Sequence, residues 1–220
     1  EERGIYSDTK VLDTILYFAE LNNWERKKAQ AEALRWLEKL ELESYKNKKV
    51  EELSKGMQQK IQFIISMIHQ PRLLVLDELF SGLDPVNQDL FKKIVEELAH
   101  SGITILLSSH RMNMVEELCD RIFLINKGKR VLYGHLEDIK RNFGLKTARI
   151  KTAESIKELR KNPYVRNMEE NENELKFNIG REIRIIDFLN SLPSSLEMEE
   201  ISITDPSLHS IFVNTVREEG

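Results

Sequence analysis

The sequence is poor in cysteine, glycine, proline and aromatic residues, and each shortage excludes a class of protein. A single cysteine, Cys119, cannot form an intramolecular disulfide, which fits a reducing cytosol. Nine glycines and five prolines exclude collagen-like and low-complexity chains. Aromatic residues make up 7% and form no basic–aromatic stripe, so we expect no nucleic-acid partner. No apolar run approaches the roughly 20 residues of a membrane-spanning helix, and no signal-peptide pattern opens the chain.

The composition is that of a folded protein with a substantial core. Hydrophobic residues make up 40% and charged residues 32% of the 220 residues, and the net charge is −4. This length supports one large domain or two small ones. Because the first residue is Glu1 rather than Met, we expect the chain to be a piece of a longer protein.

The N-terminal two thirds alternates helical and strand patterns. Apolar residues recur every three or four positions in two segments and again after Ser54, which predicts three helices. Short continuous apolar runs then predict strands, two of them buried on both faces of a parallel sheet. The expected helices are 11–21, 25–40, a helix from Ser54 to near Pro71, 86–100 and 112–119; the expected strands are 73–76, 103–107, 121–126 and 130–133, the last two joined by a turn at Lys127-Gly128-Lys129. This order indicates an α/β layered domain, which we place at residues 1–144.

The remaining residues, 145–220, follow a βαββαβ pattern with a terminal helix, which predicts a small ferredoxin-like α+β domain. The expected elements are strand 147–151, helix 153–161, strands 165–169 and 174–179, helix 183–192, strand 196–204 and helix 206–216. We expect this second domain to have its own core, formed by Ile150, Ile156, Leu159, Leu175, Phe177, Ile186, Leu189, Ile201 and Ile203.

Two carboxylates, Asp77 and Glu78, follow directly after the apolar run 73–76. Open α/β sheets bind ligands at the carboxyl ends of their strands. In a phosphate-handling site, Asp77 would hold Mg²⁺, directly or through water, and Glu78 would orient and polarise an attacking water. Taken alone, the pair also fits a buried strand followed by acidic residues near a helix start.

Three neighbouring motifs favour the phosphate-handling interpretation. They are Leu53-Ser54-Lys55-Gly56-Met57-Gln58 before the strand, Ser81-Gly82-Leu83-Asp84-Pro85 after it, and Ser108-Ser109-His110 at the end of the next strand. In this order and spacing, the set resembles the signature, Walker B, D-loop and switch-histidine motifs of the ATP-binding-cassette (ABC) ATPases. The resemblance implies the P-loop NTPase fold of that family over residues 1 to about 140, with its N-terminal part absent.

The resemblance also implies roles for individual residues. The signature residues Ser54, Lys55, Gly56 and Gln58 would contact the γ-phosphate of an ATP held by the opposite subunit, aided by the helix N-terminus. Asp84 would meet the partner subunit at the nucleotide-binding interface, although Ser54 also suits a helix cap and the Asp84 segment also suits an ordinary turn. His110 would donate a hydrogen bond to the γ-phosphate and act with Glu78 in catalysis.

The match departs from the family pattern at a few positions. Lys55 replaces the first signature glycine, Met57 stands where the pattern has Gln, and Leu79 replaces the usual proline after the catalytic glutamate. Lys55 keeps a positive charge near phosphate, so we expect altered tuning rather than loss. The form Lys-Gly-Met-Gln-Gln-Lys is similar to that of bacterial exporters of the sodium and drug type, as are the first six residues and the C-terminal segment around Asp205-Pro206-Ser207-Leu208.

A P-loop, Gly-x4-Gly-Lys-Ser/Thr, does not occur in the 220 residues; the only Gly-Lys pair is Gly128-Lys129. The resemblance therefore places the adenine-stacking aromatic, the P-loop and the Q-loop before Glu1. We expect the chain to be inactive alone. Outside this constellation, four histidines show no metal-ligand spacing with Cys119: His69, His100, His135 and His209.

The sequence thus predicts the ATP-binding subunit of a bacterial ABC transporter, with ATP and Mg²⁺ as cofactors. Its expected partners are a membrane permease and a second ATPase subunit, in a homodimer or heterodimer, on the cytoplasmic face of the membrane. One alternative is a soluble ABC ATPase with no transport role, although tandem cassettes and long coiled-coil insertions are absent. Another is a ligand-sensing or dimerising module in residues 145–220.

Overall fold

The structure is a computed structural model that describes residues 6–152, 159–171, 174–193 and 196–218. Its contacts divide the chain into two units, Glu1–His110 and Arg111–Gly220. The expected boundary between residues 144 and 145 stays a prediction. Within the described residues, none of the helices has the length and apolar character needed to cross a bilayer.

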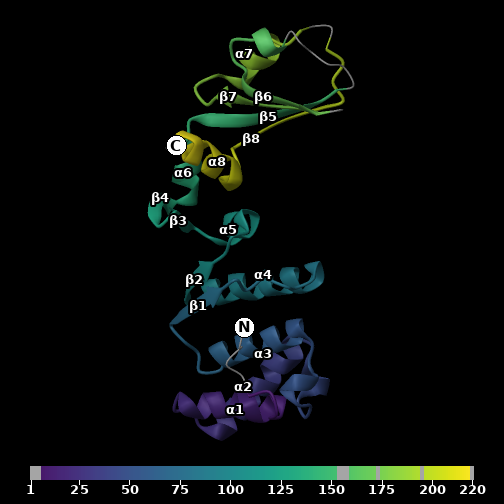
Figure 1. The fold of residues 1–220 in the computed structure, drawn as a ribbon, viewed down its shortest axis with the longest axis vertical. Coiled ribbons are helices and arrows are strands. Elements are labelled where there is room, and N and C mark those ends of the chain that lie inside the picture. Colours follow the sequence, from purple (N-terminus) through teal and green to yellow (C-terminus); the bar gives the residue numbers. More distant parts are fainter. Residues whose placement is uncertain (1–5, 153–158, 172–173, 194–195, 219–220) are drawn as a thin grey trace. The chain divides into compact units, whose positions relative to one another are not determined.

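The first unit combines a helical group with a two-stranded parallel sheet (Figure 1). Its elements are α1 (Val11–Leu21), α2 (Arg26–Lys39), the short 3₁₀ helices Glu43–Tyr45 and Val50–Glu52, α3 (Lys55–Met67), β1 (Leu73–Asp77), α4 (Pro85–His100) and β2 (Thr104–Ser108). The predicted elements are confirmed, and α1 has the predicted bounds. The sheet pairs β1 with β2 in register, so that Leu73 lies beside Thr104 and Asp77 beside Ser108.

Three aromatic side chains join the helices of this unit. The Trp36 ring on α2 meets Phe63 on α3 edge-on at 5.9 Å between centroids, and Phe63 meets Phe91 on α4 at 5.0 Å. All three are buried. Edge-to-face pairs of this kind add about 0.5–1.5 kcal/mol each beyond the burial of their area. The signature helix α3 is therefore held firmly between α2 and α4.

The prediction that both strands are buried on both faces is wrong for this sheet. Leu74 and Leu76 are buried on the side where α4 packs, whereas Leu73, Val75 and Leu106 are 56%, 61% and 60% exposed. The continuous apolar run was correctly assigned to a strand. Its second face is open because no described segment of this unit packs against it.

The second unit begins with a helix and a hairpin and continues into a four-stranded sheet. Its elements are α5 (Met112–Leu118), β3 (Arg121–Asn126), β4 (Lys129–His135), α6 (Leu136–Asn142), β5 (Leu145–Lys151), the 3₁₀ helix Leu159–Lys161, β6 (Arg166–Asn171), β7 (Glu174–Gly180), α7 (Ile185–Asn190), β8 (Glu200–Thr204) and α8 (Leu208–Glu218). The predicted turn between β3 and β4 is confirmed. Lys127 and Gly128 both have positive φ, +47° and +74°, as a tight hairpin turn requires.

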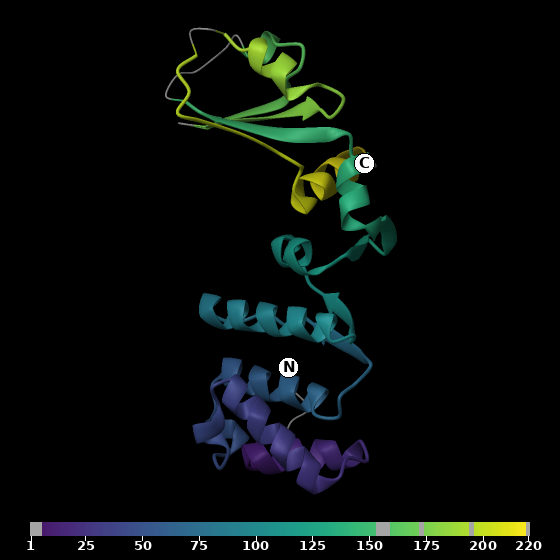
Figure 2. The ribbon, with the colours of Figure 1, turned by 180° about the vertical axis from the view of Figure 1, so that it is seen from behind.

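The four-stranded sheet has the order β6-β7-β5-β8, and every neighbouring pair is antiparallel. In sequence order this is 2-3-1-4, the arrangement expected of a split βαβ domain. Figure 2 shows this sheet from behind, with α7 on one face. Most of the expected helix 153–161 lies outside the described residues, and its last three residues form a 3₁₀ turn instead of an α-helix.

The core of the sheet lies on the face covered by α7, and it is a separate cluster. Of the nine predicted core residues, four are fully buried there, three are partly buried against it, and Ile156 lies outside the described residues. The prediction that Ile186 belongs to this core is wrong, because this residue is 53% exposed. On α7 the side chain that turns inward is Phe188, which packs at 5.7 Å from Phe177.

A second, smaller cluster in this unit joins Ile122, Leu136 and Leu208. Leu208 opens α8, and α8 packs against α5. The C-terminal helix is therefore attached to residues that precede the four-stranded sheet.

Candidate functional site

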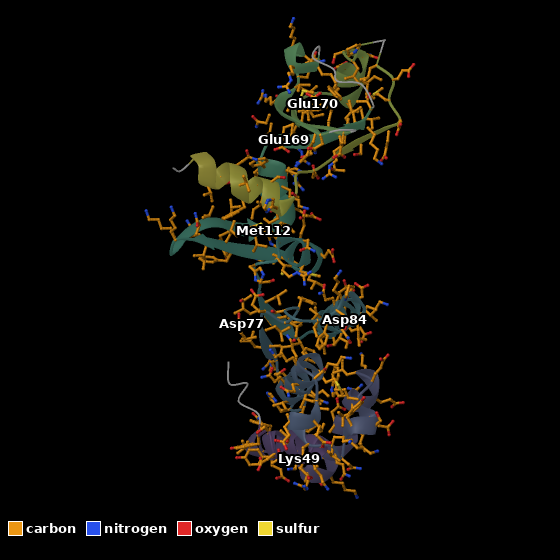
Figure 3. All side chains as sticks on the ribbon, turned by 45° about the vertical axis from the view of Figure 1, so that its right-hand side comes forward. Lys49, Asp77, Asp84, Met112, Glu169 and Glu170 are labelled. Carbon is orange, nitrogen blue, oxygen red and sulfur yellow. The ribbon has the colours of Figure 1, made fainter. Side chains whose placement is uncertain are left out.

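The carboxyl ends of β1 and β2 lie side by side and place a carboxylate beside a hydroxyl. Asp77 is the last residue of β1 and Ser108 the last of β2, and they pair in the parallel register. The Ser108 hydroxyl donates a hydrogen bond to Asp77 Oδ1 at 2.5 Å. Asp77 is exposed at this edge (Figure 3), so its other oxygen can bind a ligand.

Glu78, the next residue, has an unusual backbone conformation. Its φ is +49°, in the left-handed region that costs a residue with a Cβ about 1–2 kcal/mol. The Glu78 amide donates to Ser108 O at 3.0 Å, which fixes the residue against the end of β2. Strain of this kind concentrates at functional sites, where it aims a side chain that regular structure would direct elsewhere.

The Glu78 side chain is anchored to His110 by one oxygen. Glu78 Oε1 accepts a hydrogen bond from the His110 backbone N–H at 3.0 Å and lies 2.8 Å from the ring nitrogen Nδ1. Since an ionised carboxylate only accepts, we assign the Nδ1 proton to this contact. The second oxygen, Oε2, is buried and has no hydrogen-bond partner among the residues that the structure describes. A buried unpaired carboxylate oxygen is costly, and a bound water is the partner that satisfies it most simply.

The signature residues lie at the start of α3. Ser54 is the helix cap, and its hydroxyl accepts from the Met57 amide at 3.3 Å. Lys55 and Gly56 occupy the first two helical positions. A Cβ added at Gly56 would lie 3.7 Å from Leu83 Cδ2, an ordinary contact. No steric demand within the described chain therefore requires glycine at this position.

Two glutamines on α3 tie the signature to its surroundings. Gln58 Nε2 donates to Val50 O at 3.2 Å and to Leu53 O at 3.1 Å, so this side chain stabilises the turn that precedes the helix. Gln59 Nε2 donates to Leu79 O at 2.7 Å, directly after Glu78. The sequence reasoning missed Gln59, and no local pattern signals it, because its partner is 20 residues away.

Asp84 caps α4, where Pro85 is the first helical residue. Its Oδ1 accepts from the Asn87 amide at 3.0 Å, and its Oδ2 accepts from the Asn87 side chain. These hydrogen bonds, the backbone one first, lower the pKa of the Asp84 carboxyl. Asp84 thus has a structural role within the chain, and its expected contact with a partner subunit remains a proposal.

The residues present fit a Mg²⁺ ion that is shared with a phosphate. Mg²⁺ typically takes one or two protein carboxylates and completes its shell with water and substrate phosphates. Asp77 has one oxygen oriented by Ser108 and the other open. Among the described residues, no group of three or more His, Cys, Asp and Glu side chains could form a complete metal cage.

Of the eight predicted site residues, three lie together, whereas Ser54, Lys55, Gly56 and Gln58 lie at the start of α3 and Asp84 caps α4. Asp77, Glu78 and His110 meet at the ends of β1 and β2. Gln59 connects the signature helix to the segment after Glu78. Ser108 is a further site residue, which its place at the end of the neighbouring strand could have indicated. The arrangement can position a water at Glu78 and hold a cation at Asp77.

Comparison with family profiles gives two matches. Residues 134–216 match the profile described as "ATP-binding protein DrrA1-3-like, C-terminal domain". Residues 11–116 match an AAA domain profile described as "putative AbiEii toxin, Type IV TA system".

Comparison with known proteins gives relatives over nearly the whole chain. The uncharacterised ABC transporter ATP-binding protein YhaQ of Bacillus subtilis is 44% identical over 216 residues, or 98% of this chain and 72% of YhaQ. An uncharacterised ABC transporter ATP-binding protein of Alkalihalophilus pseudofirmus is 40% identical and covers 98% of this chain and 81% of its own length. A solved ATP-binding subunit of an ABC transporter is 27% identical and aligns with a TM-score of 0.59, over 64% of this chain and 58% of that one.

Proposed function

The chain belongs to the ABC transporter ATP-binding proteins, and from that premise we propose that it supplies one half of an ATP-hydrolysing site in a transporter. ATPase activity is general in this family. In the proposed site, the signature residues of this chain face an ATP molecule held by a second ATPase subunit. Asp77, Glu78 and His110 serve the nucleotide held on their own subunit.

The observation that carries this proposal is the position of Glu78. Its left-handed backbone and its anchored Oε1 hold the carboxylate at the end of β2, and the side chain is 35% exposed. Oε2 is buried and has no hydrogen-bond partner among the described residues, so in this proposal a water reaches it when the nucleotide binds. An ionised carboxylate in this position orients the water and accepts its proton as the water attacks the γ-phosphate. General bases of this kind typically contribute about 10²- to 10⁴-fold to a rate.

His110 has two proposed duties that its ring cannot perform at once in the neutral form. With the Nδ1 proton directed to Glu78, Nε2 of a neutral ring is only an acceptor. A hydrogen bond from His110 to the γ-phosphate therefore requires either the charged ring or a rotation that releases Glu78. We propose that the ring rotates toward the γ-phosphate when the nucleotide arrives, so that Oε1 loses the ring contact and keeps the backbone N–H of His110.

The Mg²⁺ ion, when bound with ATP, neutralises phosphate charge and orients the transferred group. The residue that would hold it is Asp77, through its open oxygen or through a water, with Ser108 keeping the carboxylate in place. The proposed site needs a P-loop, which the 220 residues do not contain, so we expect the chain alone to hydrolyse no ATP.

The proposed cellular role is export through a separate membrane permease, on the cytoplasmic face of the membrane. The direction of transport rests on the similarity of the signature, Lys55 to Lys60, to the sodium- and drug-exporter branch. The second ATPase subunit can be identical or different. The transported substrate is selected by the permease.

The test is Glu78→Gln in an assembled ATPase that contains this chain together with a P-loop. The amide keeps the volume and the contact with the His110 N–H, so MgATP binding and subunit closure should persist. Hydrolysis should fall by about 10²- to 10⁴-fold. Glu96→Gln, an equal change of charge on the exposed face of α4, should leave the rate unchanged. Near-normal turnover of the Glu78→Gln enzyme would overturn the assignment.

A further inference from the structure

The four-stranded sheet of the second unit has a polar face opposite its core. Along β5, Ala148 and Ile150 are buried in the core, so the alternating residues Thr147 and Arg149 face the other way. The same alternation places Lys176 of β7 on this face, between the buried Leu175 and Phe177. This side of the sheet has no assigned role in nucleotide chemistry.

Two like charges lie directly opposite each other on the polar face. Arg149 pairs with Lys176 in the β5–β7 register. Like charges in this position destabilise a sheet. Lys176 has one compensating carboxylate, Glu169 of β6 at 3.5 Å, which is itself largely exposed. The Arg149 side chain forms no hydrogen bond or ion pair with any residue in the described ranges.

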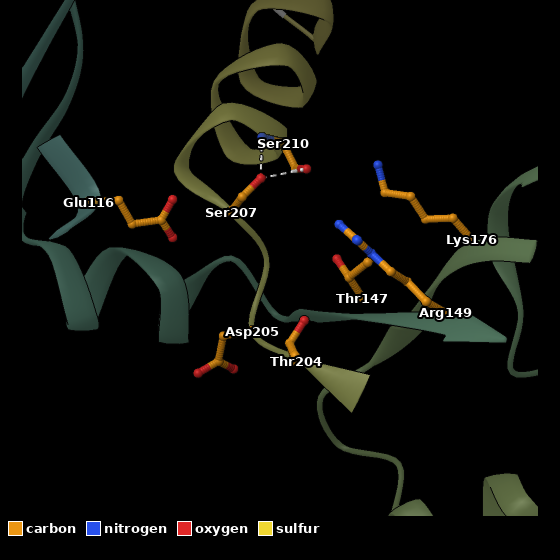
Figure 4. Close-up of a pocket in the computed structure, with 8 residues that line it drawn as sticks. All are labelled: Glu116, Thr147, Arg149, Lys176, Thr204, Asp205, Ser207 and Ser210. Carbon is orange, nitrogen blue, oxygen red and sulfur yellow. Dashed lines mark hydrogen bonds between the residues drawn. The ribbon is translucent and has the colours of Figure 1, made fainter. Parts of the chain in front are cut away.

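Both cations line a cavity of about 100 Å³ beside the first turn of α8. Figure 4 shows their side chains extending toward Ser207 and Ser210 across this space. The hydroxyls of Thr147 and Thr204 also line it. Sites for drug-sized ligands usually measure about 300–1,000 Å³, so this cavity suits a small ion or a single ionic group.

Two carboxylates at the rim already have partners of their own. Glu116 forms an ion pair with Lys140 and also accepts from the Leu208 amide at 3.2 Å. Asp205 pairs with Arg181 at 3.2 Å. Neither carboxylate therefore neutralises Arg149, and the positive charge in the cavity remains available.

The first turn of α8 does not account for an affinity of this cavity for anions. Glu116 takes the Leu208 amide, and the Ser207 hydroxyl accepts from the Ser210 amide at 3.2 Å, so the first turn is capped from within. The Thr147 hydroxyl already donates to Asn178 Oδ1 at 3.5 Å, and the hydroxyls of Ser207 and Ser210 share one hydrogen bond at 3.0 Å, which leaves one of these two protons for a ligand. The groups left for a ligand are therefore the two cations and one of the serine hydroxyls. Cations and hydroxyl donors together match the oxygens of a phosphate group.

We propose that this cavity binds a phosphate group, which neutralises the opposed Arg149 and Lys176. Arg149 donates its guanidinium N–H groups to two phosphate oxygens, Lys176 donates to a third, and the Ser210 hydroxyl, which can accept from Ser207, donates as well. The site is independent of the proposed ATPase site, because all of its residues belong to the second unit. It gives residues 145–220 a ligand-binding role.

The test is titration of inorganic phosphate into the 220-residue chain, followed by calorimetry and by the melting temperature at constant ionic strength. Phosphate should bind and raise the melting temperature, while chloride should do neither. Arg149→Gln should lower the phosphate affinity by about tenfold or more, the usual loss for a charge-assisted hydrogen bond. Arg149→Lys should lose less affinity than Arg149→Gln, since lysine keeps the positive charge but lacks the paired guanidinium N–H groups that bind two phosphate oxygens.

The matched control is Lys151→Gln, on the same strand and the same face, because Lys151 is already paired with Glu200 at 2.8 Å and does not line the cavity. It should change phosphate affinity less than twofold, well below the loss at Arg149. Circular dichroism verifies that each variant is folded. An equal loss of affinity in Lys151→Gln and Arg149→Gln would overturn the proposal, because phosphate would then respond to the net charge of the surface and not to the cavity.

A second experiment distinguishes a free phosphate ion from a lipid headgroup as the source of the phosphate group. Phosphatidylcholine vesicles with and without phosphatidic acid are sedimented with the wild-type chain and with Arg149→Gln. Binding of inorganic phosphate identifies a free solute as the source; Arg149-dependent binding to phosphatidic acid alone identifies a lipid headgroup. Binding to neither probe, or binding that Arg149→Gln leaves unchanged, would overturn the proposal.

Discussion

Glu78 Oε1 lies within hydrogen-bond distance of two nitrogens of one residue, the backbone N and the ring Nδ1 of His110. The two contacts differ in what a mutation can remove. His110→Ala deletes the ring and keeps the amide, so the carboxylate stays roughly in place but loses one charge-assisted partner.

We therefore expect His110→Ala to lower hydrolysis by about 10- to 100-fold in an assembled ATPase that contains this chain, the equivalent of one such hydrogen bond. His100→Ala is the matched control, because His100 is exposed at the end of α4 and its ring hydrogen-bonds to the Glu96 carbonyl of the same helix. The measurement is the steady-state ATPase rate with nucleotide affinity determined in parallel. A rate unchanged by His110→Ala would separate the histidine from catalysis.

Gly56→Ala should show whether glycine is needed here for stability or for nucleotide binding. The added Cβ meets Leu83 at an ordinary distance, and alanine favours helix by up to about 1 kcal/mol over glycine. Thermal stability should stay constant or rise. Hydrolysis in the assembled ATPase should fall, because the proposed nucleotide approaches this backbone closely. A fully active Gly56→Ala enzyme would argue against a close nucleotide at α3.

The 220-residue chain alone should show no micromolar affinity for MgATP. Its sequence has no Gly-x4-Gly-Lys-Ser/Thr segment to wrap the phosphates, and Asp77 and Glu78 are both negative. Isothermal calorimetry provides the measurement, and Asp77→Asn should give the same trace as the wild type. A micromolar dissociation constant would show that the remaining motifs bind nucleotide by themselves.

The pKa of Asp84 predicts a pH dependence of stability. Its lowered value in the folded state means that the ionised cap stabilises α4 above the unfolded-state pKa, about 3.9, and that this contribution disappears as the pH falls through the folded-state pKa. Asp84→Asn keeps a capping side chain without the charge. The difference in melting temperature between the two proteins should therefore shrink between about pH 5 and pH 3. A constant difference would contradict the assignment.

Leu208→Ala should destabilise the second unit by about 2–5 kcal/mol, because Leu208 is buried against Ile122 and Leu136. Ile186→Ala, a comparable truncation at an exposed position, should change stability by less than about 0.5 kcal/mol. Urea unfolding followed by circular dichroism measures both. Similar losses in the two variants would contradict the packing of α8. If the prediction holds, a cut between residues 144 and 145 would also remove part of a cluster formed by earlier residues.

The regular elements could be predicted because their information is local. Periodicity placed α1 and β3 at their observed bounds, and the Lys127-Gly128 pair marked the hairpin. Which faces of a strand are buried was predicted less well. An apolar run such as 73–76 indicates a strand, but whether its second face is covered depends on segments far along the chain.

The residues of the proposed site could be named from the sequence, but their geometry could not. Asp77 and Glu78 could be identified from their place after an apolar strand, and His110 from the resemblance of the motif set to the ABC ATPases. Nothing in the sequence around Glu78 indicates a left-handed backbone, because glutamate has no preference for that conformation. The opposed pair Arg149 and Lys176 likewise depends on strand register, which two segments separated along the chain establish only on folding.

The left-handed φ of Glu78 has a consequence for the engineering of this protein. Glycine adopts that conformation freely, so a selection for heat resistance alone would favour Glu78→Gly, which relieves backbone strain and removes an unpaired buried oxygen together. The same substitution deletes the carboxylate that the proposed reaction needs. Libraries screened by melting temperature should accordingly enrich inactive chains at this one position, and position 78 should be held fixed in any such campaign.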